Sequence, residues 1–165
     1  MRTLNRKSEK DRKIDFDPHI TEEKHNKYKK QFENIKKQIP FLSDEVARLA
    51  LLGDFSENVE YQIAKRKLRS TNNKKMKIDF ILNNSKIIKI NENSDKVKIG
   101  NTILLKINNQ EKTYKILGSQ ESDPSKNIIS HNSPLAQILL NKKINDEVEL
   151  KLKNKINKYK IIEIK

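Results

Sequence analysis

Seven apolar residues recur at alternating steps of four and three between positions 28 and 49. This spacing places them on one narrow stripe of an α-helix and is typical of a coiled-coil seam, which a second helix must cover. Thr21, followed by Glu22 and Glu23, predicts the start of the helix, since early acidic residues suit a helix N-terminus. Pro40 lies inside the stripe and predicts a kink or an interruption there. The seam consists of Tyr28, Phe32, Ile35, Ile39, Leu42, Val46 and Leu49.

The next segment predicts a second helix that folds back on the first. Gly53 suits the end of the first helix, and Asp54 with Glu57 three residues later predicts the cap of the second. Two helices joined by a few residues lie antiparallel. We therefore expect a helical hairpin over residues 20–90, with its tip near residues 51–58. Its second seam is weaker because two of its positions are polar: Tyr61, Ala64, Leu68, Thr71, Lys75, Ile78 and Leu82.

The remainder of the chain carries short apolar stretches separated by turn residues. Residues 87–90 are strand-like, and residues 91–95 read as a linker. Ser133 as N-cap and Pro134 as first residue predict one short helix. The fold class is therefore α+β: an antiparallel coiled-coil hairpin, then a small, mainly antiparallel sheet domain at 96–165. The strands expected in that domain are 99–107 and 113–117 as a hairpin, 128–129, 148–152 and 159–164.

The first 19 residues mix both charges and contain few large apolar side chains. Such a composition predicts a disordered or loosely attached arm.

The composition is strongly basic and lacks cysteine. There are 36 Lys and Arg against 22 Asp and Glu, a net charge of +14, which implies an acidic partner such as nucleic acid, or else a membrane surface. Disulfides and thiolate metal sites are excluded. No apolar run approaches the roughly 18 residues needed to span a bilayer, and the charged N-terminus is not a secretory signal. We expect a soluble cytoplasmic protein with no membrane association.

Residues 65–77, KRKLRSTNNKKMK, contain seven basic residues and no acidic one. A charge run is usually a solvated helix face. Here there are no acidic partners four positions away, and the run invades the hairpin seam, where it costs stability. Binding to phosphates is therefore favoured over a plain solvated face.

The predicted hairpin tip is acidic in this basic chain. Asp54 and Glu57 can be read as a capping box, or as two carboxylates that share one helix face and could hold Mg²⁺. Two carboxylates do not complete a hydrolytic centre, so the missing ligands would come from another protein. His19, His25 and His131 show no metal-ligand spacing and are expected at the surface. No glycine-rich phosphate loop and no G-x-S-x-G motif is present.

Three segments together resemble one protein family. GDFSENVEYQ at 53–62 resembles the GD-x-x-EN-x-EY signature at the coiled-coil tip of the bacterial Gre transcript-cleavage factors. The KRKLR that follows is similar to that family's basic patch. IISHNSPLAQILLNKKINDEVEL, at residues 128–150, is similar to a stretch of its C-terminal domain. The resemblance covers residues 20–165.

The resemblance implies a fold and a mechanism. The fold is an N-terminal antiparallel coiled coil followed by an FKBP-like domain that docks on bacterial RNA polymerase. The coiled coil enters the secondary channel, and its tip steadies a second Mg²⁺ shared with the polymerase active site. The polymerase then cuts the extruded 3′ RNA of a backtracked complex, so the factor, expected to be a monomer, is not itself an enzyme.

The family's roles carry over to matching residues. Asp54 and Glu57 correspond to the metal-assisting, catalytic pair. The tip is shaped by Gly53, Asn58, Glu60 and Tyr61. The extruded RNA is held by Lys65, Arg66, Lys67 and Arg69. The polymerase-docking domain includes Ser133, Pro134, Leu135 and Ala136, where core packing is an equal explanation.

Departures and alternatives remain. Leu51-Leu52, Phe55 and Val59 replace commoner residues of the family, and residues 1–19 have no recognised counterpart. One alternative function is a channel-binding inhibitor on the same scaffold, although the intact Asp54 and Glu57 favour cleavage. An RNA-binding coiled coil without a polymerase role and a free-standing nuclease are the others.

Overall fold

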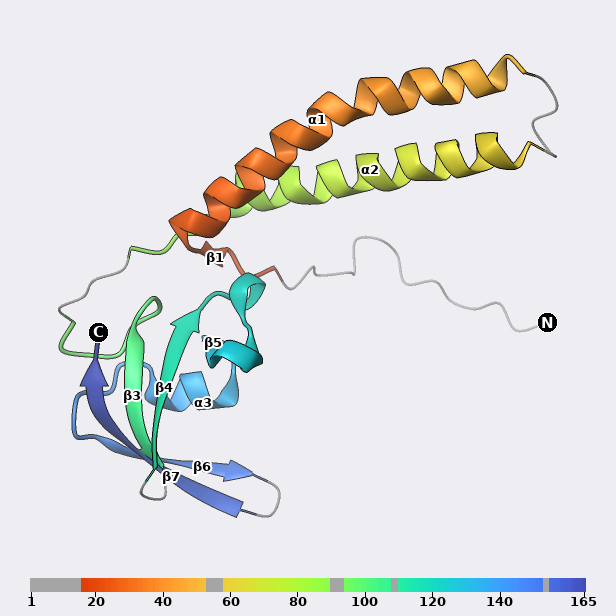
Figure 1. Cartoon of the computed structure of the whole chain (residues 1–165). Helices are drawn as coiled ribbons and strands as arrows, with labels where there is room; N and C mark the ends of the chain where they lie inside the picture. The colour runs from red at the N-terminus through yellow and green to blue at the C-terminus, as the bar shows by residue number, and fades with distance from the viewer. Residues whose placement is uncertain (1–15, 53–57, 90–93, 108–109, 153–154) are drawn as a thin grey trace, which may run out of the picture.

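The structure of the protein, a computed structural model, describes residues 16–52, 58–89, 94–107, 110–152 and 155–165. A rod of two long helices is joined to a domain built around a curled sheet (Figure 1). The predicted α+β class and the order of the two parts are confirmed. None of the helices among the described residues is long and apolar enough to cross a bilayer.

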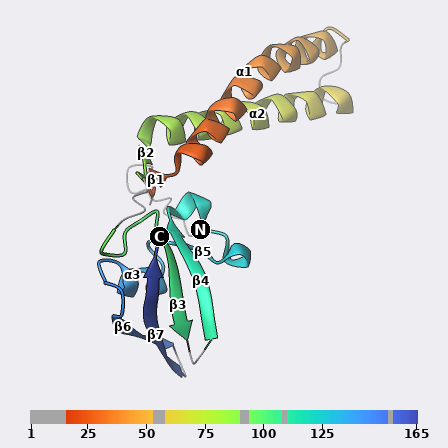
Figure 2. The same ribbon diagram turned by 60° about the vertical axis from the view of Figure 1, so that its left-hand side comes forward.

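The rod consists of α1 (Glu22–Ala50) and α2 (Val59–Asn84), which lie side by side and antiparallel in both views (Figures 1 and 2). The predicted start of α1 is confirmed, because Thr21 Oγ1 accepts a hydrogen bond from the Lys24 backbone N–H at 3.3 Å. The possibility that Pro40 interrupts this helix is wrong, since α1 continues through it. Pro40 is exposed, so its ring faces solvent while the seam packs on the opposite side.

The predicted seam of α2 faces α1. Ile78 is buried, and the other six seam positions, including the polar Thr71 and Lys75, are half-buried. The Lys75 ammonium lies 5.9 Å from the centre of the Phe32 ring on α1. This cation–π contact explains how a lysine is tolerated at a position where a coiled coil favours an apolar residue.

The sheet domain has five strands in the order β5-β4-β3-β7-β6. All neighbouring pairs are antiparallel except β4 and β5, which are parallel. The strand predictions are confirmed with small shifts at their ends. The strands are β3 (Thr102–Ile107), β4 (Gln110–Leu117), β5 (Ile128–Ser130), β6 (Glu147–Leu152) and β7 (Lys155–Ile164).

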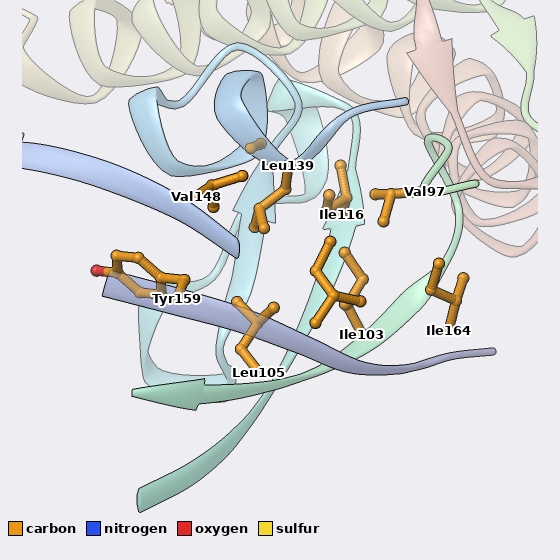
Figure 3. Packing of buried hydrophobic residues seen from close by; sticks show 10 residues of the cluster. Val97, Ile103, Leu105, Ile116, Leu139, Val148, Tyr159 and Ile164 are labelled. Carbon is orange, nitrogen blue, oxygen red and sulfur yellow. The ribbon is translucent and has the colours of Figure 1, made fainter. Parts of the chain in front are cut away.

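The core of this domain lies between the sheet and α3 (Pro134–Leu139). Figure 3 shows Leu139 from α3, Ile116 from β4 and Ile103 from β3 converging on one space. All three side chains are fully buried. The remaining buried members of this cluster are Val97, Leu105, Ala136, Val148, Tyr159, Ile161 and Ile164.

The segment before α1 is packed at the base of the rod. β1 (His19–Ile20) pairs in parallel with β2 (Lys86–Ile87), which follows α2, and Ile20 is fully buried. The Phe16 ring makes an edge-to-face contact with Phe80 on α2, with 5.0 Å between ring centres. The prediction that residues 1–19 form a loose arm is therefore wrong for its last four residues; residues 1–15 lie outside the described part of the chain.

Two carboxylates join this segment to the sheet domain. Asp17 accepts hydrogen bonds from the backbone N–H groups of His19 and Ser119. Glu121, in the short 3-10 helix Ser119–Glu121, accepts two more from the Thr21 N–H and hydroxyl, at 2.7 and 2.6 Å. Burial alone would raise the pKa of Asp17, but the hydrogen bonds from Ser119 and His19 outweigh it and lower the pKa to about 2.

We predict that Gly118→Ala loosens this junction. A Cβ at position 118 would lie 1.8 Å from the His19 carbonyl oxygen, so the backbone of β1 would have to move away. The Lys86 and Ile88 N–H groups donate to the carbonyls of Pro18 and Ile20. Their hydrogen-exchange protection is expected to fall by about ten-fold or more.

Gln120→Ala is the matched control, because this nearby side chain is exposed and the change adds no bulk. The bonds that Asp17 and Glu121 accept are retained, so exchange at Lys86 and Ile88 should stay as in the wild type. Unchanged exchange in Gly118→Ala would show that the close approach of β1 to position 118 does not hold the junction.

Candidate functional site

The sequence predicts that the metal-assisting carboxylates lie at the far end of the rod. α1 ends at Ala50, and the Leu51 N–H donates to the Ala47 carbonyl at 3.2 Å. Residues 53–57 connect this end to α2, and they include Gly53, Asp54 and Glu57. These three residues lie outside the part of the chain that the structure describes, so their predicted roles stay predictions.

The helix that follows is capped by Asn58. Its Oδ1 accepts a hydrogen bond from the Tyr61 backbone N–H at 3.0 Å, and α2 begins at Val59. The prediction that Asp54 caps this helix is therefore wrong. Asn is as effective an N-cap as Asp, and Glu60 supplies the acidic residue of the first turn, so Asn58 satisfies the same physical requirement four positions later.

Two of the predicted tip residues differ in environment. Glu60 is exposed, whereas Tyr61 is half-buried in the seam. The Lys65 ammonium lies 5.5 Å from the centre of the Tyr61 ring. Tyr61 therefore packs between the helices and also anchors the first basic residue of the run.

The basic run divides into one outer face and two flanks. Arg66 and Arg69 line a shallow concavity on α2 together with Ser70, Asn73, Lys74 and Lys77. These positions are spaced by three, four, seven, eight and eleven residues, which places them on one side of a helix, opposite the seam. All six are exposed, and within the described residues none of the four basic ones forms an ion pair.

The two remaining members of the predicted RNA-binding set flank that face. Lys65 contacts Tyr61, and Lys67 lines a separate groove between the helices, beside Glu45 and Glu60. The structure thus places Arg66 and Arg69 with Lys74 and Lys77, two residues that the predicted RNA-binding set did not include. Helical periodicity could have identified Lys74 and Lys77, because residues on one helix face recur every three or four positions and need not be adjacent in sequence.

The four predicted docking residues have different environments. Ser133 Oγ accepts from the Ala136 N–H at 3.2 Å and caps α3, as predicted. Ala136 is fully buried and Leu135 is half-buried against the core, whereas Pro134 is exposed. Structural roles therefore account for three of these residues, and Pro134 offers the most surface to a partner.

The expectation that all three histidines lie at the surface is wrong for His131. The side chain of His131 is only 15% exposed, and its ring centre lies 4.9 Å from that of His19. Both rings adjoin the Asp17 carboxylate. Ligand spacing along the sequence could not reveal this cluster, because folding brings together residues more than a hundred positions apart.

Comparison with known proteins gives matches over both parts of the chain. Residues 19–87 match the family model for the N-terminal domain of transcription elongation factors, and residues 92–165 match that for the C-terminal domain of GreA/GreB. The transcription elongation factor GreA of Thermotoga maritima is 32% identical over 148 residues, which cover 88% of this chain and 95% of that protein.

Two further matches have the same extent. The GreA of Macrococcus caseolyticus is 35% identical over 149 residues, covering 88% of this chain and 94% of that protein. The crystal structure of GreA factor homolog 1 from Thermus thermophilus aligns at 16% identity with a TM-score of 0.39, covering 86% of this chain and 94% of that one.

We predict that Asn58→Ala destabilises the rod by about 1 kcal/mol, because the Tyr61 N–H loses its side-chain acceptor. Urea unfolding followed by helical circular dichroism measures this loss. Asn58→Asp, which keeps an acceptor oxygen, should retain stability. Asp54→Ala should cost much less than Asn58→Ala; an equal cost would return the capping role to Asp54.

Proposed function

This chain belongs to the GreA/GreB family of transcription elongation factors, and we propose that it stimulates RNA polymerase to cleave the 3′ end of a backtracked transcript. The sheet domain docks on the polymerase, and the rod enters the secondary channel as a monomer. The polymerase performs the cleavage, so this protein is not itself an enzyme. We infer from this role that the protein acts in the cytoplasm.

The shape of the rod supports this proposal. With 29 residues in α1 and 26 in α2, each helix is about 40 Å long, because an α-helix rises 1.5 Å per residue. The rod is two helices wide along its length (Figures 1 and 2). Such an element can carry a few side chains into a narrow channel that a globular domain cannot enter.

The observation that carries the proposal is the cap of α2. Asn58 Oδ1 accepts the Tyr61 N–H and caps α2, so neither Asp54 nor Glu57 is needed for that hydrogen bond. These residues lie in the segment joining the two helices at the far end of the rod. Two carboxylates in that segment of a basic chain suit the binding of a cation there.

The donor set fits Mg²⁺ shared with the polymerase. Mg²⁺ prefers oxygen ligands and is commonly held by one or two protein carboxylates, with the remaining positions filled by water or substrate. Asp54 and Glu57 supply those carboxylates. The chemistry that bound Mg²⁺ provides in phosphoryl transfer is activation of the attacking oxygen and stabilisation of the leaving one.

The outer face of α2 suits the extruded RNA. Arg66, Arg69, Lys74 and Lys77 are exposed on one side and have no acidic partner among the described residues. Cations in this arrangement can neutralise successive phosphates and release their counterions. Lys65 and Lys67 add charge at the margins of this face.

We predict that Asp54→Asn lowers transcript cleavage by about 100-fold, because loss of one charged metal ligand removes about 3 kcal/mol of transition-state stabilisation. Halted elongation complexes with 3′-labelled, backtracked RNA measure the release of short 3′ fragments. Asp79→Asn is the matched control: Asp79 is exposed on α2 near the opposite end of the rod.

Other results of the same experiment discriminate between functions. Slowed elongation without fragments, with wild type and Asp54→Asn alike, would contradict the proposal and indicate a channel-binding inhibitor. Cleavage of naked RNA by the protein and Mg²⁺ alone would indicate a nuclease.

We also predict that Arg66→Gln with Arg69→Gln lowers cleavage of long backtracked RNAs several-fold and affects short ones less, because only a long extruded strand reaches this face. RNA affinity should lose about 0.7 of its log–log salt slope for each phosphate contact removed. Lys36→Gln with Lys37→Gln, on the exposed surface of α1, controls for net charge. Equal losses for the two double variants would show that charge acts without regard to position.

A further inference from the structure

Three potential metal ligands from two distant segments meet at the base of the rod. Asp17 lies just before β1, His19 is the first residue of β1, and His131 follows β5. One ligand atom from each of the three side chains lies within 4.8 Å of the other two. The cluster is separate from the rod tip and from the basic face of α2.

Two distances from the Asp17 carboxylate are close to those within a zinc coordination sphere, and one of them is also a hydrogen bond. His19 Nδ1 is 3.0 Å from Asp17 Oδ1, and His131 Nδ1 is 3.3 Å from Asp17 Oδ2. Tetrahedral Zn²⁺, with bonds of about 2.0–2.1 Å to nitrogen and oxygen, holds neighbouring ligand atoms about 3.3 Å apart. Because the three ligand atoms lie within 4.8 Å of one another, changes in side-chain torsion can bring them around one ion.

Hydrogen bonding does not account for the whole cluster. His131 Nδ1 is buried, yet it has no hydrogen-bond partner among the described residues, because its approach to Asp17 Oδ2 lacks hydrogen-bond alignment. A buried ring nitrogen without a partner is costly. A metal ion between this nitrogen and the carboxylate removes that cost, since the nitrogen lone pair becomes a ligand.

Neighbouring backbone groups orient the Asp17 carboxylate, and the His19 side of the cluster is open to solvent. The backbone N–H groups of His19 and Ser119 both donate to Asp17, which fixes its orientation as outer-shell donors do in metal sites. The Asp17 side chain is 5% exposed, whereas that of His19 is 37% exposed. An ion can enter from the His19 side, where water can fill the fourth position.

We propose that Asp17, His19 and His131 form a Zn²⁺ site that fastens the segment before α1 to the sheet domain. Two imidazoles and one carboxylate favour zinc over magnesium, which prefers oxygen ligands. Because the ligands come from both sides of the junction, bound zinc ties the base of the rod to the strand β5 region. This site does not depend on the proposed action on RNA polymerase.

The test uses the full chain without a histidine tag. Zn²⁺ is titrated in competition with a chromophoric chelator, in the absence and presence of excess Mg²⁺. We expect one equivalent of Zn²⁺ to bind, no displacement by Mg²⁺, and a rise in Tm with Zn²⁺ concentration, since the ion binds only the folded junction. Co²⁺ in place of Zn²⁺ should give the visible absorption of a tetrahedral site.

Two ligand variants and one control complete the experiment. Asp17→Asn and His131→Gln should each weaken Zn²⁺ binding by about 100-fold or more, because even outer-shell losses cost 10- to 100-fold. His25→Gln, which removes the third histidine from α1, should bind as the wild type does.

Absence of one-equivalent binding by the wild type would overturn the proposal, as would full binding by both ligand variants or an equal loss in His25→Gln. If circular dichroism shows that Asp17→Asn is misfolded, the wild-type stoichiometry and His131→Gln still decide the outcome.

Discussion

The direction of the rod depends on carboxylate hydrogen bonds at its base, and the most direct of them involve Thr21 at the first turn of α1. The Thr21 hydroxyl accepts from the Lys24 N–H, which caps the helix, and donates to Glu121 of the sheet domain. The Thr21 N–H donates to the same carboxylate. Hydrogen bonds to a charged group contribute about 1.5–3 kcal/mol each, so this residue both starts the helix and fixes its base. Together with the bond from the Ser119 N–H to Asp17, this contact sets the angle of the hairpin to the domain that carries it.

The rod itself has little apolar core. In its described part only Ile35, Leu49 and Ile78 are buried, and the rest of the seam is half-buried. A narrow seam leaves most of the surface of both helices to solvent, which permits the charge distribution that the proposed function uses. The outer face of α2 can be basic because it does not contact α1, and no acidic residue occurs between Lys65 and Lys77.

Periodic patterns predicted most of this fold. The a/d spacing gave both helices of the hairpin, alternation and turn residues gave the strands, and Ser133-Pro134 gave α3. These signals are local and repeat over several residues, so tertiary context does not change them.

The sequence predictions were wrong where a single residue or a long-range contact determines the structure. Asn58 and Asp54 are equivalent caps in sequence, and only the geometry of α2 distinguishes them. The two-residue strand β1 is too short to give a pattern, and it forms because β2 supplies its hydrogen-bond partners. The cluster around Asp17 unites residues that no sequence spacing connects.

The position of the cap bears on which role the tip residues have. A residue that both starts a helix and binds an ion is constrained twice, because a change that improves one role can damage the other. Here Asn58 provides the hydrogen bond that α2 requires. Asp54 and Glu57 are not needed for that hydrogen bond, so their carboxylates can serve the chemistry proposed for the tip. Two carboxylates in a chain with net charge +14 suit the cation that we propose there.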